Sequence, residues 1–342
     1  MSNYGAYYGG GNRPNGYVSY EEKRVWDKRV RMRVLSTSAV LCCGICGYVL
    51  FSALASEIIV NVPVLRETYL NSSLFSVFFD MLYSFLCVGL PFFAVFMFFR
   101  LFTGHTPDIR FGGVYDKTNA VLLVISGLGV CFLGNVIDSM LINWLGNFGL
   151  EFYSYAEAAS GADVPNGVLE FVLTSVRTAL IPALIEEFAF RGVVLGALRK
   201  YGDGFAIGVS AALFGLMHGN FTQVPFALIA GTALGFICVV TGSIWPSVIL
   251  HFLNNFISVL YGAALAKTGD SSVLLSVTVT YGLIFIGAVA FGIYLFRNKN
   301  GLRLRPGPFA STRGKAVAFM LSPTFLIGAG ALAGRMIEDI VR

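Results

Sequence analysis

Charged residues are scarce in this chain of 342 residues. Asp, Glu, Lys and Arg make up 13% of the sequence and hydrophobic residues 56%, and the mean hydropathy is +0.73. A soluble domain carries roughly a quarter charged residues, so too few are present to cover a water-exposed surface of this size. The composition excludes a soluble domain and indicates an all-α fold, a polytopic transmembrane helix bundle.

Cysteines are few and lie in the wrong places for a disulfide framework. All six fall inside apolar runs, whereas structural disulfides in secreted domains cross-link exposed loops. Cys42, Cys43 and Cys46 are closely spaced, but no second Cys or His cluster completes a metal site with them. We therefore interpret the cysteines as small buried side chains.

Hydrophobic runs long enough to cross a bilayer recur along the chain. Each crossing needs about 20 apolar residues. The sequence predicts about eight spans and a possible ninth, at residues 34–60, 74–99, 119–145, 167–198, 204–219, 224–241, 245–264, 273–296 and, for the ninth, 316–334. The predicted organisation is a flexible, then basic tail at 1–33, accessory helices at 34–150, a central bundle at 165–265, and a C-terminal helix or helices with a basic loop at 266–342.

Lys and Arg are distributed unevenly between the predicted connecting segments. With the N-terminus inside, the inner segments carry 18 of them and the outer segments four. Because cytoplasmic loops are enriched in Lys and Arg, the sequence predicts a cytoplasmic N-terminus, and we expect an integral protein of the plasma membrane. The same residues lie in short runs beside apolar segments, a pattern that argues against nucleic-acid binding.

Ionisable side chains inside the predicted spans are uncommon, because each costs at least about 2.5–3.5 kcal/mol to insert. Asp80 and Arg177 are predicted to be structural. In the fourth span, Glu187 and Arg191 are spaced i,i+4 in the favourable order and are predicted to pair. Glu186 points about 100° away from that pair, so no neighbour on its own helix neutralises it.

Two further predicted spans carry polar groups at a comparable depth. The fifth span ends in His218, and the seventh carries His251 and Asn255 one turn apart on one face. At about 1.5 Å per residue, Glu186 and His218 lie roughly 20 Å from the inner ends of their helices, and His251 and Asn255 roughly 9 and 15 Å from theirs. The three helices are therefore predicted to converge on one inward-opening cavity.

These residue types suit hydrolysis of a peptide bond. A carboxylate and an imidazole that share a water can activate it as a nucleophile, a role that fits Glu186 and His218. A second imidazole and an amide can donate hydrogen bonds to the oxyanion, at about 3–4 kcal/mol for one such donor, and this role fits His251 and Asn255. Two alternatives remain open: a buried polar network that fixes helix register, and a proton- or cation-coupled transporter that uses the intramembrane carboxylates.

The same residues resemble the three motifs of the CAAX-protease and bacteriocin-processing (CPBP) family of intramembrane endopeptidases. The motifs E-E-x-x-x-R, F-x-x-x-H and H-x-x-x-N occur in the family's order at 186–191, 214–218 and 251–255. The resemblance covers about 165–265 and implies that this bundle is the catalytic unit of a glutamate-dependent endopeptidase. It further implies an eight-helix bundle open to cytosol and lipid, with Glu187 and Arg191 supporting the catalytic groups.

The resemblance leaves the role of a metal open, since the family has also been described as metalloproteases. Two Glu and two His could ligate zinc, but the motif H-E-x-x-H is missing from the sequence. We therefore expect no cofactor, with zinc as the alternative. The expected partners are membrane lipid and a hydrophobic or lipidated peptide substrate, such as a prenylated CAAX tail or a bacteriocin precursor. The sequence does not indicate an oligomeric state.

Overall fold

The computed structural model describes residues 20–148, 167–268, 272–299, 304–307 and 310–341. Within these residues all regular structure is helical, as the composition predicts. The flexible tail predicted for residues 1–19 lies outside the described residues.

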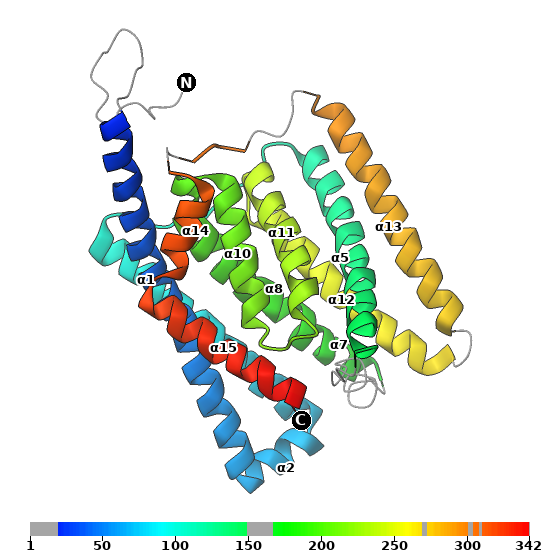
Figure 1. Ribbon diagram of the computed structural model, residues 1–342. Helices are drawn as coiled ribbons and strands as arrows, with labels where there is room; N and C mark the ends of the chain where they lie inside the picture. Colours follow the sequence, from blue (N-terminus) through cyan, green and yellow to red (C-terminus); the bar gives the residue numbers. More distant parts are fainter. Residues whose placement is uncertain (1–19, 149–166, 269–271, 300–303, 308–309, 342) are drawn as a thin grey trace.

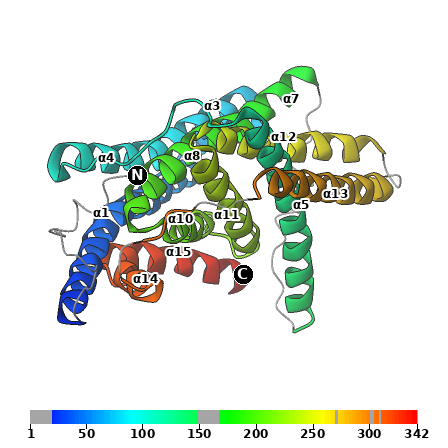
Figure 2. The ribbon, with the colours of Figure 1, turned by 90° about the horizontal axis from the view of Figure 1, so that it is seen from above.

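The described chain folds into long helices joined by short connections (Figure 1). The first part contains α1 (Tyr20–Asn61), α2 (Pro63–Asn71), α3 (Ser73–Tyr83), α4 (Leu90–Phe98) and α5 (Lys117–Gly146). The second part contains α7 (Val168–Ser175), α8 (Ile181–Glu187), α9 (Leu195–Leu198), α10 (Asp203–Met217), α11 (Val224–Thr241), α12 (Trp245–Thr268), α13 (Ser272–Arg297), α14 (Thr312–Met320) and α15 (Pro323–Val341). Viewed from the side and from above, α10 and α11 lie between a group formed by α1, α14 and α15 and a pair formed by α5 and α13 (Figures 1 and 2).

Seven helices or continuous helical runs of the described chain are long and apolar enough to cross a membrane, or eight if one bent pair counts as a span. The protein is thus an integral membrane protein. Two predicted spans differ from the structure. The fifth is α10, which has only 15 residues, and the ninth is the pair α14 and α15, bent by 75°, because Pro323 begins the new helix and cannot continue the old one.

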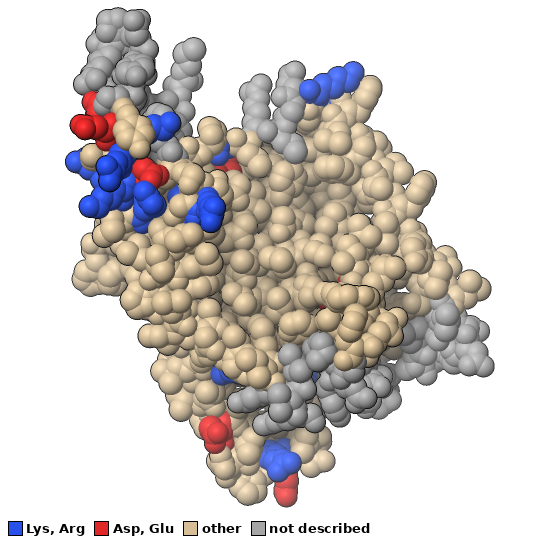
Figure 3. Space-filling view, viewed as in Figure 1, with Lys and Arg blue, Asp and Glu red and all other residues tan. Residues whose placement is uncertain are grey.

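The basic residues predicted as a tail belong to the first turns of α1 instead. This helix begins at Tyr20, with Glu21 and Glu22 in its first turn, where negative charge favours a helix. Arg31 pairs with Asp27 one turn earlier. Figure 3 shows Lys and Arg gathered over the start of α1, with a further basic side chain at the end of α13, so one end of the described chain is basic on this face.

Prolines determine where the long spans change geometry. The fourth span runs from Val168 to Tyr201 and includes two π-helical segments, η4 (Val176–Leu180) and η5 (Phe188–Val194). The first of them comes directly before the turn that contains Pro182, where a missing N–H and a bulky ring disfavour regular α-helix. The span is therefore π-helical, and so wider, on both sides of the turns that carry Glu186 and Glu187.

Small residues let α10 and α11 pack closely. A Cβ on Gly231 would meet the Phe214 ring at 3.1 Å and the Cα of Ala211 at 3.2 Å, and one on Gly235 would meet Ile207 at 3.4 Å. The second Gly-x-x-x-Gly pair of the sequence, at residues 192 and 196, faces the connecting segment around Asp108 and Ile109 instead of a helix. Of the two Gly-x-x-x-Gly pairs, only the one at residues 231 and 235 therefore makes a close helix–helix contact.

The remaining structural predictions concern buried polar and sulfur groups. Arg177 forms an ion pair with Asp80 at 3.1 Å, which joins the fourth span to α3 as a structural contact. All six cysteines are described and all are free thiols, four of them buried, one partly buried and one exposed.

Candidate active site

Three helices bring the predicted site residues together. Glu186 and Glu187 form the end of α8, His218 follows the last residue of α10, and His251 and Asn255 lie on α12. These helices are far apart in sequence, and the packing of α8 and α10 against their neighbours fixes the relative positions of the polar groups.

A fully buried ion pair lies at the centre of this arrangement. Arg191 Nη1 is 3.0 Å from Glu187 Oε1, and both side chains are 0% exposed. Arg191 also donates through Nη2 to the carbonyl oxygen of Gly231 at 3.1 Å, and its guanidinium lies 4.5 Å from the centre of the Phe214 ring. Since a buried charge is tolerated only when it is paired, the predicted supporting pair neutralises itself and ties α8 to α11.

The same carboxylate positions a catalytic candidate. His251 Nδ1 lies 2.9 Å from Glu187 Oε1, so this nitrogen carries a hydrogen and donates a hydrogen bond to the carboxylate. The other ring nitrogen, Nε2, lies 3.9 Å from Glu186 Oε2. Glu187 therefore orients the imidazole so that its free edge faces Glu186.

Glu186 differs from Glu187 in accessibility. Its side chain is 24% exposed, against 0% for Glu187, so of the two adjacent carboxylates only this one can meet water or a substrate. Tyr48 on α1 lies in the neighbourhood of Glu186 and Tyr83. The first helix thus contributes to the surroundings of the site.

Phe214 is the common neighbour of both imidazoles. Its ring centre lies 4.8 Å from that of His218 and 5.9 Å from that of His251, each in an edge-on arrangement. His218 Nδ1 lies 2.9 Å from the carbonyl oxygen of Phe214. A carbonyl oxygen only accepts, so Nδ1 donates, and in the neutral ring Nε2 is left as a proton acceptor.

Asn255 lies one turn beyond His251 on α12, as predicted. It donates through Nδ2 to the carbonyl oxygen of Thr178 at 3.1 Å, and its Oδ1 accepts from Asn254 Nδ2 at 3.0 Å. An amide nitrogen carries two hydrogens, so one remains for a further acceptor. The two contacts hold the amide in one orientation.

The structure brings some of the predicted site residues into contact with one another. The structure brings Glu186 next to His251, and both imidazoles next to Phe214. Among the described residues no direct hydrogen bond joins Glu186 to His218.

Several residues that contact the site were not predicted to belong to it. Phe214 and Gly231 carry signals in the sequence, because one begins a motif and the other belongs to a Gly-x-x-x-Gly pair. Nothing in the sequence marks Tyr48, Thr178 and Asn254 as site residues, because their contacts with the site depend on how the helices pack.

The described residues contain no group of three or more His, Cys, Asp or Glu side chains arranged to hold a metal ion.

One comparison with known proteins gives a match. Residues 168–257, from α7 to α12, match the family model described as type II CAAX prenyl endopeptidase Rce1-like. The matched stretch lies inside residues 165–265 and contains all three motifs. No curated protein and no solved structure matches the chain.

Proposed function

We propose that this membrane protein is a protease whose CAAX endopeptidase domain spans residues 168–257, the stretch that matches the family model, and that it cleaves its substrate by direct attack of a water molecule. In this proposal Glu186 and His218 activate the water, and His251 and Asn255 stabilise the oxyanion. The observation that supports it best is the contrast between two adjacent carboxylates: Glu187 is buried and paired, whereas Glu186 is accessible and faces an imidazole.

The hydrogen bonds of the histidines support this division of roles. His218 donates through Nδ1 to the Phe214 carbonyl, so its Nε2 can accept a proton from water. As the water attacks the peptide carbonyl, its proton passes to the Glu186–His218 pair and then to the leaving amine nitrogen, which balances the hydrolysis. No covalent intermediate with the protein is needed.

The oxyanion site uses the remaining donors. The Nδ1 of His251 already donates a hydrogen bond to Glu187. His251 therefore donates to the oxyanion through Nε2 in the form that carries a hydrogen on both ring nitrogens. Asn255 offers its second amide hydrogen, and its contacts with Thr178 and Asn254 hold it in place. Such pre-oriented donors stabilise the negative charge that develops on the carbonyl oxygen.

The proposed substrate is a peptide with a lipid or hydrophobic anchor. The matched family is named for prenyl endopeptidases, and such a substrate could reach Glu186 from the surrounding lipid. We propose that no metal takes part, that the N-terminus and the basic end face the cytosol, and that the site opens toward the same side in the plasma membrane. The family match gives no support to the transporter alternative.

A cleavage assay with matched peptides tests the function. The purified protein in lipid nanodiscs is given a farnesylated peptide that ends in a CAAX sequence, or the same peptide without the farnesyl group. We expect release of the three terminal residues from the farnesylated peptide, at a rate at least tenfold higher than from its unmodified partner. Equal rates would contradict the lipid-anchored substrate, and no cleavage of either peptide would contradict the proposed activity on CAAX tails.

A further inference from the structure

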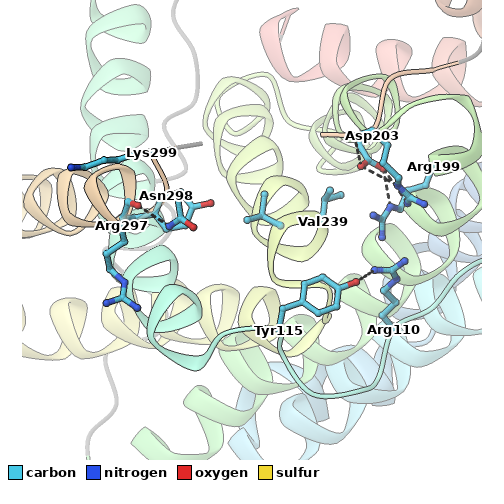
Figure 4. Close-up of a pocket in the computed structure, with 11 residues that line it drawn as sticks. Arg110, Tyr115, Arg199, Asp203, Val239, Arg297, Asn298 and Lys299 are labelled. Carbon is cyan, nitrogen blue, oxygen red and sulfur yellow. Dashed lines mark hydrogen bonds and ion pairs between the residues drawn. The ribbon is translucent and has the colours of Figure 1, made fainter. Parts of the chain in front are cut away.

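A cavity of about 540 Å³ lies at the basic end of the protein, away from the proposed active site. Its walls come from separate parts of the chain, and Figure 4 shows Arg110, Arg199 and Asp203 on one side and Arg297 and Asn298 on the other. Arg199 lies 13 residues beyond Glu186 on the same helical span, roughly 20 Å at the rise of a helix. The proposed hydrolysis does not use this cavity.

One wall gathers three guanidinium groups around two carboxylates. Arg199 Nε lies 3.0 Å and Arg305 Nη2 3.3 Å from Asp203 Oδ1. Arg110 Nη2 lies 3.0 Å and Arg199 Nη1 4.0 Å from Asp108 Oδ2. Arg110 also donates through Nη1 to the Tyr115 hydroxyl. In these contacts three positive charges share two negative ones.

The opposite wall adds positive charge and an uncharged polar group. Arg297 lies 3.8 Å from Asp116 and donates through Nε to Asn119 Oδ1 at 3.3 Å, and Lys299 also belongs to the lining. Figure 4 shows Asn298 directed toward the cavity and Lys299 away from it. With the valines at 239 and 240 between the two walls, the cavity combines a cationic rim with an apolar floor.

The segment that carries Arg110 is fixed firmly to the start of α12. The carbonyl oxygen of Arg110 accepts from the Ile244 N–H at 3.0 Å, and Tyr115 packs over Gly242 so closely that a Cβ there would collide with its ring. Gly242 also has φ +71°, the left-handed region that favours glycine. Arg110 is therefore held in place before any ligand arrives.

Aromatic side chains place this cavity at the depth of lipid headgroups. Phe111 and Trp245 are 56% and 45% exposed, their ring centres are 6.5 Å apart, and the Trp245 indole N–H donates to the Phe111 carbonyl. Exposed tryptophan and tyrosine side chains collect where a membrane meets water, and Tyr115 of the cavity lining is also exposed. A cavity beside them meets headgroups rather than acyl chains.

We propose that this cavity binds a phosphate group, carried by the headgroup of an anionic phospholipid. Guanidinium groups match phosphate oxygens in geometry and charge, and basic pockets between membrane helices are suited to lipid headgroups. The excess positive charge of the walls needs an anion to offset it, and the apolar floor suits the part of a lipid next to its headgroup.

The test measures lipid binding by the purified full-length protein in detergent. Dioleoyl phosphatidylglycerol is compared with dioleoyl phosphatidylcholine, whose choline offsets the phosphate charge, by lipid retention in native mass spectrometry and by the thermal unfolding midpoint. Glycerol 3-phosphate serves as the soluble phosphate. The variants are Arg110→Gln and Arg297→Gln in the lining, and Arg313→Gln as a matched control, because this exposed arginine lies at the start of α14 outside the cavity.

We expect phosphatidylglycerol to bind and stabilise the parent and Arg313→Gln, with little effect of phosphatidylcholine. Each lining variant should bind phosphatidylglycerol about tenfold or more weakly, the usual effect of losing a hydrogen bond to a charged group. Unchanged binding by both lining variants, or an equal loss in Arg313→Gln, would overturn the proposal. Stabilisation by glycerol 3-phosphate equal to that by the lipid would overturn the lipid as the source of the phosphate. If Arg110→Gln does not fold, phosphatidylglycerol binding by Arg297→Gln, whose side chain is more exposed, tests the proposal.

Discussion

His251 and Glu187 meet through a hydrogen bond of 2.9 Å between Nδ1 and Oε1. The bond joins α12 to the end of α8 and leaves Nε2 of the imidazole facing Glu186 at 3.9 Å. Because Glu187 also pairs with Arg191, one buried carboxylate both stabilises the bundle and orients the histidine. The two adjacent glutamates thus take different tasks, one structural and one proposed as catalytic.

This division predicts different effects of the same substitution at adjacent positions. Glu187→Gln leaves Arg191 buried without its counter-charge, which should cost about 3–5 kcal/mol of stability and also disturb His251. Glu186→Gln should leave the unfolding midpoint nearly unchanged, because that side chain is partly exposed. Thermal unfolding in detergent measures both, and equal destabilisation by the two variants would contradict the assignment.

Close contact between α10 and α11 predicts opposite outcomes for two glycines. Gly231→Ala places a methyl group 3.1 Å from the Phe214 ring and 3.2 Å from the Ala211 backbone, so overpacking should destabilise the protein by about 1–3 kcal/mol and slow cleavage by displacing Phe214. Gly208→Ala, on α10, meets nothing within 4 Å and should be neutral or stabilising by up to about 1 kcal/mol. Equal midpoints for the two variants would argue against this packing.

Asp203 predicts how stability depends on pH. Burial alone would raise the pKa of this carboxyl, but the backbone N–H of Arg305 and the guanidinium of Arg199 hold the pKa below its usual value. Asp203 therefore stabilises the folded protein at pH values above about 3.9, the pKa of an Asp side chain in the unfolded chain. This stabilisation is lost as the pH falls through the lower pKa that Asp203 has in the folded protein.

Asp203→Asn should therefore be less stable than the parent at neutral pH and should lose less stability on acidification. Unfolding midpoints between pH 7 and pH 3 measure the difference. The control is Asp116→Asn, because Asp116 is an exposed N-cap of α5 and Asn caps a helix equally well. Parallel curves for Asp203→Asn and the parent would refute the prediction.

The proposed metal-free mechanism predicts no effect of chelators. Cleavage of the farnesylated peptide should proceed at the same rate after prolonged dialysis against EDTA or 1,10-phenanthroline. A loss of activity that zinc restores would show that a metal takes part and would favour zinc ligation by the Glu and His residues instead.

Local relationships in the site could be read from the sequence. The Glu187–Arg191 pair is predicted by its i,i+4 spacing and is confirmed at 3.0 Å, and His251 and Asn255 share a helix face because they are one turn apart. The overall fold follows equally directly, since composition and the long apolar runs predict a membrane helix bundle.

Relationships between distant segments could not be read in this way. The hydrogen bond from His251 to Glu187 spans 64 positions, and nothing in either helix alone encodes it. The partner of Arg177 is Asp80 on another span, and the basic cavity exists only because residues from several separate parts of the chain pack together. The bend between α14 and α15 lies at Pro323, but its angle of 75° cannot be read from the sequence.

The most direct measurement compares peptide cleavage by Glu186→Gln with that by the parent, under single-turnover conditions in nanodiscs. Glutamine keeps the shape of the side chain and removes the base, so the proposal predicts a rate at least about 10²–10⁴-fold lower, with an unchanged unfolding midpoint. Glu57→Gln is the matched control, because Glu57 bonds Asn61 on the exposed face of α1, and it should cleave at the parental rate. Cleavage by Glu186→Gln at the parental rate would contradict the account.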